Sequence, residues 1–396
     1  MEIIKSYKIR LKPTEEQEVL FRKSVGVSRF IYNWCIEQEL NSDEFIPIGE
    51  LRKNITIMKK QDDYKFLNEV GNNVIKQSAR NLDRAYTNYF NLMKKKDYVR
   101  YSKKTIQKAK SQNKTLTVYE SYGYPKFKKK GEHNSFYVNY ESMKKRPNGV
   151  QCEKLGIIKT SEPLPEIKGK HYVNPNIVYD NKYWYIIFGV RIDIEDLKDN
   201  TDEIIGVDLG IKNLATCSNG MVFENINKTN RIKRIEKRLK RLQRKSSRKQ
   251  KLNLNNNSNN INKIKKQIAL LYRKLTNIRE DYMFQKINTL VITKPKRIIV
   301  EDLNIKGMMQ NKHLSKAISE QCFYRCLKIL EFKCKINFIE FVKADRFYPS
   351  SKLCSRCGNI KKDLKLKDRT YKCECCGLVI DRDLNASINL ANYELT

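Results

Sequence analysis

The chain has 396 residues, enough for roughly two to three domains, and 40% of them are hydrophobic, which excludes wholesale disorder. The 80 Lys and Arg residues exceed the 44 Asp and Glu residues by a net charge of +36. This excess is clustered, so it favours a polyanion, most commonly nucleic acid, over a surface that is merely solubilising. Because no apolar run reaches the about 18 residues of a membrane span, and the first residues lack a signal-peptide core, we expect no membrane contact and a cytoplasmic, or in a prokaryote nucleoid-associated, protein.

The first part of the chain predicts one strand followed by helices. Residues 3–11 alternate apolar and basic side chains, which indicates a strand with one basic face. Thr14 and Gln17 have the spacing of a capping box, so a helix should begin there and continue to about residue 38. A second amphipathic helix is expected from about residue 72 to residue 96, and it carries several basic residues.

From about residue 115 to residue 192 the apolar pattern changes to a period of two, which indicates strands. Asp180 and Asn181 separate two of these runs, as in a hairpin. The Asp-rich residues 193–203 are expected to form a linker. Aromatic residues in this part alternate with Lys and Arg, which suits stacking and phosphate contacts on single strands, but the same aromatics could equally fill a core.

Residues 204–224 again have the pattern of strands, and a long helical pair follows. Residues 231–251 contain twelve Lys and Arg and one acid, Glu236, with apolar residues at 3-4-3 spacing. After an Asn-rich break, residues 261–278 repeat apolar side chains at the same spacing, which favours an antiparallel hairpin over a coiled coil with a partner. The basic helix from Arg231 to Lys251 is therefore a candidate surface for following a nucleic-acid backbone.

Four of the eleven cysteines have the spacing of a metal site. Cys354 and Cys357 form one CxxC pair, and Cys373 and Cys376 form a second pair after fifteen intervening residues. Two such turns complete a tetrahedral zinc site. Because the protein supplies all four ligands, this zinc should be structural, and Cys375 is a spare. The dispersed cysteines are expected to be small buried hydrophobic residues.

Three separated carboxylates form a second constellation. Asp208 and Glu301 each end an apolar strand-like run, and Asp383 opens a segment typical of a helix start. A charge at the end of an apolar strand is costly unless it is compensated, and Mg²⁺ with its oxygen ligands supplies that compensation. Individually the acids could be a turn residue, a salt-bridge partner and an N-cap. Together, beside a zinc site in a basic chain, they predict a two-metal site for phosphodiester hydrolysis.

Two further acids lie beside members of this constellation. Asp302 and Asp381 remain alternative members of the carboxylate site on the residues alone. The three histidines are far apart in the sequence and have no identifiable partners, so a nucleophilic triad is not indicated. There is also no Walker-type loop, so the sequence gives no sign of ATP use.

These motifs together resemble the TnpB family, transposon-encoded RNA-guided DNA endonucleases regarded as ancestral to type V CRISPR effectors. The resemblance extends over essentially the whole chain, and its most specific run combines the second cysteine pair with a D-x-N-A motif. The matching runs are YKIRLKPTEEQ, YPKFKKKGEHNSF, GVDLGIKNLAT, IIVEDLNIKGM, DRFYPSSKLCSRCG and CECCGLVIDRDLNASINL.

The resemblance implies an α+β multidomain fold. An N-terminal wedge-type β-barrel with an inserted helical recognition domain would precede a RuvC-like, RNase H-type α/β nuclease domain that contains an inserted zinc ribbon. Asp208, Glu301 and Asp383 would be the catalytic, Mg²⁺-binding triad; the family's third acid lies two residues before Asn385, which selects Asp383 over Asp381. The expected boundaries are 1–12 for the first wedge strand, 13–110 for the helical domain, 111–200 for the wedge, 201–350 for the nuclease domain with a basic hairpin at 228–290, 351–378 for the ribbon and 379–396 for the last nuclease segment.

The resemblance also implies the activity, a Mg²⁺-dependent DNA endonuclease with one RuvC-like site, acting as a monomer on its guide RNA. Base pairing between guide RNA and target DNA would supply most of the specificity, and the protein would read a short motif beside the target. Three alternatives stay open: a nuclease-inactive guided repressor, a transposase that performs strand transfer, and a compact type V CRISPR effector. The presence of all three acids argues against the inactive repressor.

Overall fold

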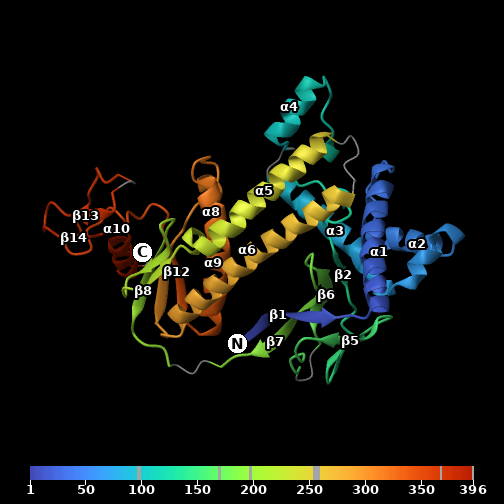
Figure 1. The fold of residues 1–396 in the computed structure, drawn as a ribbon, viewed down its shortest axis with the longest axis horizontal. Coiled ribbons are helices and arrows are strands. Elements are labelled where there is room, and N and C mark those ends of the chain that lie inside the picture. Colours follow the sequence, from blue (N-terminus) through green and yellow to red (C-terminus); the bar gives the residue numbers. More distant parts are fainter. Residues whose placement is uncertain (96–99, 168–170, 196–198, 253–258, 366–367, 395–396) are drawn as a thin grey trace. The chain divides into compact units, whose positions relative to one another are not determined.

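The computed structural model describes residues 1–95, 100–167, 171–195, 199–252, 259–365 and 368–394 (Figure 1). The chain divides into two units, Glu2–Asp193 and Met1 with Ile194–Thr396. Parts of two expected features, residues 196–198 of the linker and 253–258 of the Asn-rich break, lie outside the described residues. Among the described helices, none has the length and apolar character needed to cross a membrane.

The unit Glu2–Asp193 contains a seven-stranded antiparallel sheet in the order β2-β6-β7-β1-β5-β4-β3. The central strand β1 confirms the strand expected at residues 3–11, and it pairs with β7 from Glu2 to Leu11 and with β5 at Leu11 and Lys12. The expected hairpin across Asp180 and Asn181 joins β6 to β7. The strands are β1 Glu2–Lys12, β2 Ser135–Tyr137, β3 Lys144–Arg146, β4 Gly149–Cys152, β5 Gly156–Thr160, β6 Val173–Tyr179 and β7 Trp184–Asp193.

The expected N-terminal β-barrel is wrong in one respect, because the sheet is open. Its edge strands β2 and β3 have three residues each and do not pair with one another in the described part of the chain. Closure would require those two edges to meet. The apolar face is covered by a helix instead: Phe21 of α1 packs edge-on against Trp184 of β7, with ring centroids 5.1 Å apart, and both belong to one core.

Helices complete this unit: α1 Glu15–Leu40, α2 Ile48–Met58, η1 Asp62–Glu69, α3 Asn72–Lys94, α4 Lys103–Ser111 and η2 Val118–Glu120. The capping box at the start of α1 is confirmed, since the Thr14 N–H donates to Gln17 Oε1 at 3.1 Å and the Gln17 N–H donates to Thr14 Oγ1 at 3.3 Å. The second expected helix is α3, whose buried face includes Ile75 and Leu82.

The second unit is built on a five-stranded sheet in the order β10-β9-β8-β11-β12. Strands β8, β9 and β10 form an antiparallel meander, and β11 runs parallel to both β8 and β12. The strands are β8 Ile204–Leu209, β9 Asn213–Cys217, β10 Val222–Glu224, β11 Arg297–Glu301 and β12 Glu340–Ala344; a small separate sheet pairs β13 Thr370–Lys372 with β14 Val379–Asp381.

Helices cover both faces of the five-stranded sheet. Ile298 and Val300 of β11 enter one core with α6 and α9, whereas Ile299 enters another core with Leu390 of α10. This alternation is the period of two expected of a strand buried on both faces. The helices are η3 Ile226–Lys228, α5 Asn230–Leu252, α6 Asn259–Val291, α7 Ile305–Met308, α8 Ser315–Gln321, α9 Phe323–Ile336 and α10 Arg382–Ala391.

The expected antiparallel hairpin is formed by α5 and α6, which lie side by side (Figure 1). Its apolar seam is filled internally by Ile232, Ile235, Leu239 and Leu275. Arg279 Nη2 of α6 contacts Glu236 Oε1 of α5 at 3.2 Å. This seam therefore needs no partner coiled coil.

Helix α10 approaches β8 very closely at Gly206. A Cβ atom at this position would lie 2.0 Å from the carbonyl oxygen of Ser387 and 2.4 Å from the backbone nitrogen of Ala391. Both atoms belong to the helix backbone and cannot rotate away. The absence of a side chain at Gly206 therefore allows the helix to lie directly on the strand.

We expect Gly206→Ala to destabilise the protein by about 1–3 kcal/mol, the usual cost of inserting a methyl group into a packed core. Urea unfolding should show a lower denaturation midpoint. Amide hydrogen exchange, measured separately on the native protein, should be faster in α10. Gly26→Ala is the control, because a Cβ at this position of α1 meets no atom within 4 Å. An unchanged midpoint for Gly206→Ala would contradict the proposed close packing.

Candidate functional site

Asp208 and Glu301 occupy neighbouring strand ends. In the parallel pair of β8 and β11, Val207 is aligned with Val300, so the next residues are Asp208 and Glu301. Asp208 follows Ile204 and Gly206 on the face of β8 that meets α10, and Glu301 follows Ile299 on the same face of β11. Both acids are half-buried.

Asp383 approaches the same face from α10, where it is the second residue of the helix and 8% exposed. Its Oδ1 contacts Arg382 Nη2 at 3.2 Å. The alternative that Asp383 is an N-cap is wrong, because Asp381 caps this helix. Asp381 Oδ1 accepts hydrogen bonds from the backbone N–H groups of Asp383 at 2.9 Å and Leu384 at 3.2 Å.

The three acids share one electrostatic environment. Burial raises the pKa of Asp208 well above its ordinary value, and the charges of Glu301 and Asp383 raise it further. Arg382 acts in the opposite direction. Asp208 is thus a carboxyl group whose negative charge is disfavoured by its surroundings, as expected of a site that a cation would complete.

The carboxylates are close enough to interact but are not drawn into a tight cluster. Within the described ranges, the four cysteines are the group of three or more potential ligands whose donor atoms all lie within 4.8 Å of one another. The neighbouring acid Asp302, an alternative member of the site, is engaged elsewhere: its carboxylate and its carbonyl oxygen both accept hydrogen bonds from Arg346.

The motifs that suggested the site did not identify the residues that hold Glu301. The Ser350 hydroxyl donates to Glu301 Oε1, and Ser350 is itself 2% exposed. The Ser350 carbonyl oxygen accepts a hydrogen bond of 2.7 Å from the side-chain amide of Asn389 on α10. Two sequence features could have indicated these residues. One is the pair of adjacent serines in the run FYPSSKLCS, and the other is the four-residue spacing of Asn385 and Asn389.

Cys354, Cys357, Cys373 and Cys376 come together as the cysteine spacing predicted. Cys354 Sγ lies 3.5 Å from Cys376 Sγ, and Cys357 Sγ lies 3.6 Å from Cys373 Sγ. Four thiols in such a group are the donor set of a closed zinc site. The spare Cys375 is exposed and does not belong to the group.

Two matched turns form the cysteine site. The Gly358 N–H donates to the Cys354 carbonyl at 2.9 Å, and the Gly377 N–H donates to the Cys373 carbonyl at 3.1 Å. Both glycines have φ of +73°, which a residue with a side chain rarely adopts. Hydrogen bonds from backbone N–H groups, first that of Cys376, lower the pKa of Cys373 to about 6, whereas the pKa of its neighbour Cys357 is raised to about 12, so Cys373 is the thiol of this pair that ionises first.

Asn385 and Asn389 connect these turns to α10. Asn385 Nδ2 donates to the Leu353 carbonyl at 2.7 Å, and its Oδ1 accepts from the Ser355 N–H at 3.1 Å. Asn389 Nδ2 also donates to the Leu353 carbonyl, at 2.7 Å. Both amides are almost fully buried. The first cysteine turn is therefore fastened to the helix that carries Asp383.

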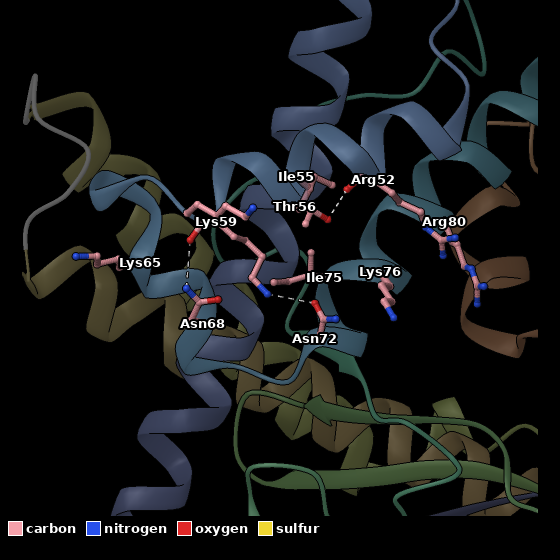
Figure 2. A pocket seen from close by; sticks show the side chains of 11 residues that line it. Arg52, Ile55, Thr56, Lys59, Lys65, Asn68, Asn72, Ile75, Lys76 and Arg80 are labelled. Carbon is pink, nitrogen blue, oxygen red and sulfur yellow. Dashed lines mark hydrogen bonds between the residues drawn. The ribbon is translucent and has the colours of Figure 1, made fainter.

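Two surfaces are strongly basic, one in each unit. On α5, most of the Lys and Arg side chains between Arg231 and Lys251 are exposed. In the unit Glu2–Asp193, a cleft of about 720 Å³ lies among α2, η1 and α3 (Figure 2). Its lining has six cationic side chains and no acid: Arg52, Lys59, Lys60, Lys65, Lys76 and Arg80.

The cleft is electrostatically prepared for an anion. Burial lowers the pKa of Lys59, and the nearby charges of Lys154 and Lys76 lower it further. Arg52 Nε is buried without a hydrogen-bond partner among the described residues. Figure 2 shows Lys59 reaching Asn72, whose Oδ1 accepts its hydrogen bond at 3.3 Å. Cations gathered at this density favour a phosphate-bearing ligand.

Three known families match separate parts of the chain. A family described as "Probable transposase" matches residues 188–312, a "Cas12f1-like, TNB domain" matches residues 323–390, and a "Helix-turn-helix domain" matches residues 1–41. The last description differs from the structure, in which these residues form strand β1 and the single helix α1.

Two similar proteins match nearly the full length of the chain, and a third matches about a third of it. The chain is 27% identical to a "Putative RNA-guided DNA endonuclease" of Streptomyces pristinaespiralis, over 98% of this chain and 89% of the relative. It is 25% identical to InsQ of Escherichia coli, a protein of the same description, over 98% and 92%. A TnpB-like protein of Acanthamoeba polyphaga mimivirus, L79, is 32% identical over 31% of this chain and 24% of its own length. These matches confirm the resemblance to the TnpB family seen in the sequence motifs.

Proposed function

We propose that this protein is an RNA-guided, Mg²⁺-dependent endonuclease that hydrolyses DNA at one RuvC-like site. The observation that carries the proposal is the placement of Asp208, Glu301 and Asp383 on one face of one sheet. After burial, the charges of Glu301 and Asp383 are the next causes that raise the pKa of Asp208, which supports a shared site. The two relatives that match over nearly the full length are described as RNA-guided DNA endonucleases, which supports the same activity here.

The proposed nuclease domain is the unit with the five-stranded sheet. Its meander of β8 to β10, followed by parallel β11 and β12, supports the RuvC-like assignment by placing two acids at adjacent strand ends. The remaining domain boundaries inferred from the sequence stay part of this proposal, with the first unit as an open-sheet wedge and its helices as the recognition part.

Asp208, Glu301 and Asp383 would hold the Mg²⁺ ions. Carboxylate oxygens are the ligands Mg²⁺ prefers, and a pair of such ions supplies charge stabilisation and an activated water for phosphodiester hydrolysis. Ser350 donates to one oxygen of Glu301 and restricts its orientation. Arg382 contacts one oxygen of Asp383 and offsets part of its charge. A carboxyl group as unfavourable to ionise as Asp208 fits a cation-binding role.

The four-cysteine group would bind a structural zinc ion. Its thiol donors fit the tetrahedral sulfur coordination of zinc, and four protein ligands leave no position for a substrate. Through Asn385 and Asn389 the group is fastened to α10. The zinc would therefore serve catalysis indirectly, by setting the position of the helix that carries Asp383.

Guide RNA and target DNA are the proposed partners. The exposed cations of α5 and the basic cleft beside α3 would contact phosphates, which position a nucleic acid without reading its sequence. Base pairing with the guide would then supply the specificity. Sequencing the RNA that co-purifies with the protein would test this directly, and a population without a recurring species would contradict guidance.

Asp208→Ala should reduce cleavage of guide-matched DNA by a factor on the order of 10³ or more, because losing metal stabilisation costs several kcal/mol. Binding of the guide RNA should be nearly unchanged. The measurement is single-turnover cleavage in Mg²⁺ alongside a filter-binding assay. Asp281→Ala, at an exposed position on α6, is the control.

Three outcomes of that assay would contradict the proposal. Cleavage retained by Asp208→Ala would show that Asp208 does not belong to the catalytic site. Guided binding by the wild-type protein without any cutting would identify a nuclease-inactive repressor. Joined DNA strands instead of hydrolysed ends would identify a strand-transferring transposase.

The raised pKa of Asp208 predicts a dependence of stability on pH. The folded state binds this proton more tightly than the unfolded state, whose pKa is about 3.9. Its stabilising effect is complete below the unfolded pKa and is lost as the pH rises through the folded pKa. In EDTA, Asp208→Asn should therefore be more stable than the wild type at neutral pH, with a difference that vanishes below about pH 4.

Urea unfolding across this pH range, with and without Mg²⁺, would measure the effect. Mg²⁺ should stabilise the wild type more than Asp208→Asn, because the variant lacks one ligand charge. Asp281→Asn should show no gain at neutral pH. A variant less stable than the wild type at neutral pH would mean that the Asp208 charge is already compensated by the protein.

Cys354→Ser should remove bound zinc and lower nuclease activity at the same time, because the first turn would no longer hold Leu353 and Ser355 against α10. Zinc content by mass spectrometry should fall from about one ion per chain, the requirement of one four-cysteine site, to near zero. Cys375→Ser should retain both zinc and activity. Full activity in a zinc-free Cys354→Ser protein would show that the catalytic site does not depend on the four-cysteine group, and would contradict its proposed role.

A further inference from the structure

Phe347 is a large apolar side chain left in solvent in the turn that follows β12. It is 88% exposed, whereas the next residue, Tyr348, packs on Tyr393 with ring centroids 4.9 Å apart. The Tyr348 hydroxyl donates to the Asn389 carbonyl at 3.0 Å. Tyr348 therefore anchors the turn to α10, whereas Phe347 extends into solvent.

The turn that carries Phe347 is held by hydrogen bonds from residues before and after it in the sequence. Asp345 Oδ1 accepts a hydrogen bond of 2.7 Å from the Phe347 N–H. Arg346 donates to the carboxylate and carbonyl of Asp302, and Ser350 donates to Glu301. The exposure of Phe347 is thus a property of an anchored turn whose contacts end on the strand that carries Glu301.

The backbone of the turn cannot lie far from Glu301. Ala344, at the end of β12, is aligned with Glu301 in the neighbouring strand, about 4.8 Å away. Three further residues can extend at most about 11 Å. The Cα atom of Phe347 therefore lies within about 16 Å of the Cα atom of Glu301, a span of a few nucleotides along a strand.

We propose that Phe347 is a stacking residue for an unpaired base of the DNA strand that enters the acidic site. The inference rests on the proposed nuclease function. A strand that reaches Asp208, Glu301 and Asp383 gains from a contact that does not depend on the charge of the site, and an apolar ring supplies one. A phenyl ring has no hydrogen-bonding group and accepts any base, which suits an enzyme whose specificity comes from guide pairing.

The experiment uses the full-length protein bound to its guide RNA. Phe347→Ala should slow single-turnover cleavage by roughly 5- to 150-fold, the range expected for losing one stacked base. Phe347→Trp should restore it. Phe284→Ala, which removes a 42% exposed phenylalanine from α6, is the matched control and should cleave like the wild type.

An abasic scan of the DNA around the cut identifies the stacked base. At one position, loss of the base should slow the wild-type enzyme by the same factor as Phe347→Ala and should slow Phe347→Ala no further. In the cleavage-deficient Asp208→Ala background, 2-aminopurine at that position should be quenched, and adding Phe347→Ala should relieve the quenching.

Different failures have different meanings. Wild-type protein that does not cut guided DNA overturns the proposed function and this inference with it. Normal cutting by wild type and Phe347→Ala alike, at every abasic position, overturns stacking alone. A change in the mass of the complex on Phe347→Ala, without a change in cleavage, would show a protein contact and would also overturn it.

Discussion

The close contact between α10 and β8 is the constraint on which the candidate site depends. Because Gly206 has no side chain, the backbone of the helix rests on the strand. Asp208 lies two residues further along this strand, and Asp383 lies in the first turn of the helix. The contact therefore sets the separation of two carboxylates contributed by segments more than 170 residues apart, whereas β-sheet pairing sets the position of the third, Glu301.

The same contact explains why so many polar groups are buried around α10. Asn385, Ser387 and Asn389 are nearly inaccessible, and a buried amide is costly unless its hydrogen bonds are made. The two asparagines make theirs with backbone groups of residues 350–355, between β12 and the second cysteine pair. Their hydrogen bonds join the cysteine site, the helix and the Ser350–Glu301 contact into one connected set.

The local sequence signals were reliable wherever a short segment contained the whole cause. The capping box of Thr14 and Gln17, the α5–α6 hairpin and the four-cysteine group all follow from spacing over a few residues or turns. The role of Asp381 as N-cap could not be separated from that of Asp383 by spacing, because both precede the same helix. The open sheet was missed because its strand order depends on pairings such as that of β1 with β7, more than 170 residues apart, and because Phe21 of α1 covers its face. Gly206, Ser350 and Phe347 needed the tertiary structure.

Helix α5 has an uneven charge balance that affects the free protein. Most of its Lys and Arg side chains are exposed, and its one acid, Glu236, already contacts Arg279 of α6. Like charges along one helix repel one another, at a cost that falls as counterions gather. The isolated chain is thus the electrostatically strained form, with ions from solution acting as substitutes. A bound polynucleotide would neutralise these cations in place of the ions from solution, so it would lower the electrostatic free energy of the protein itself.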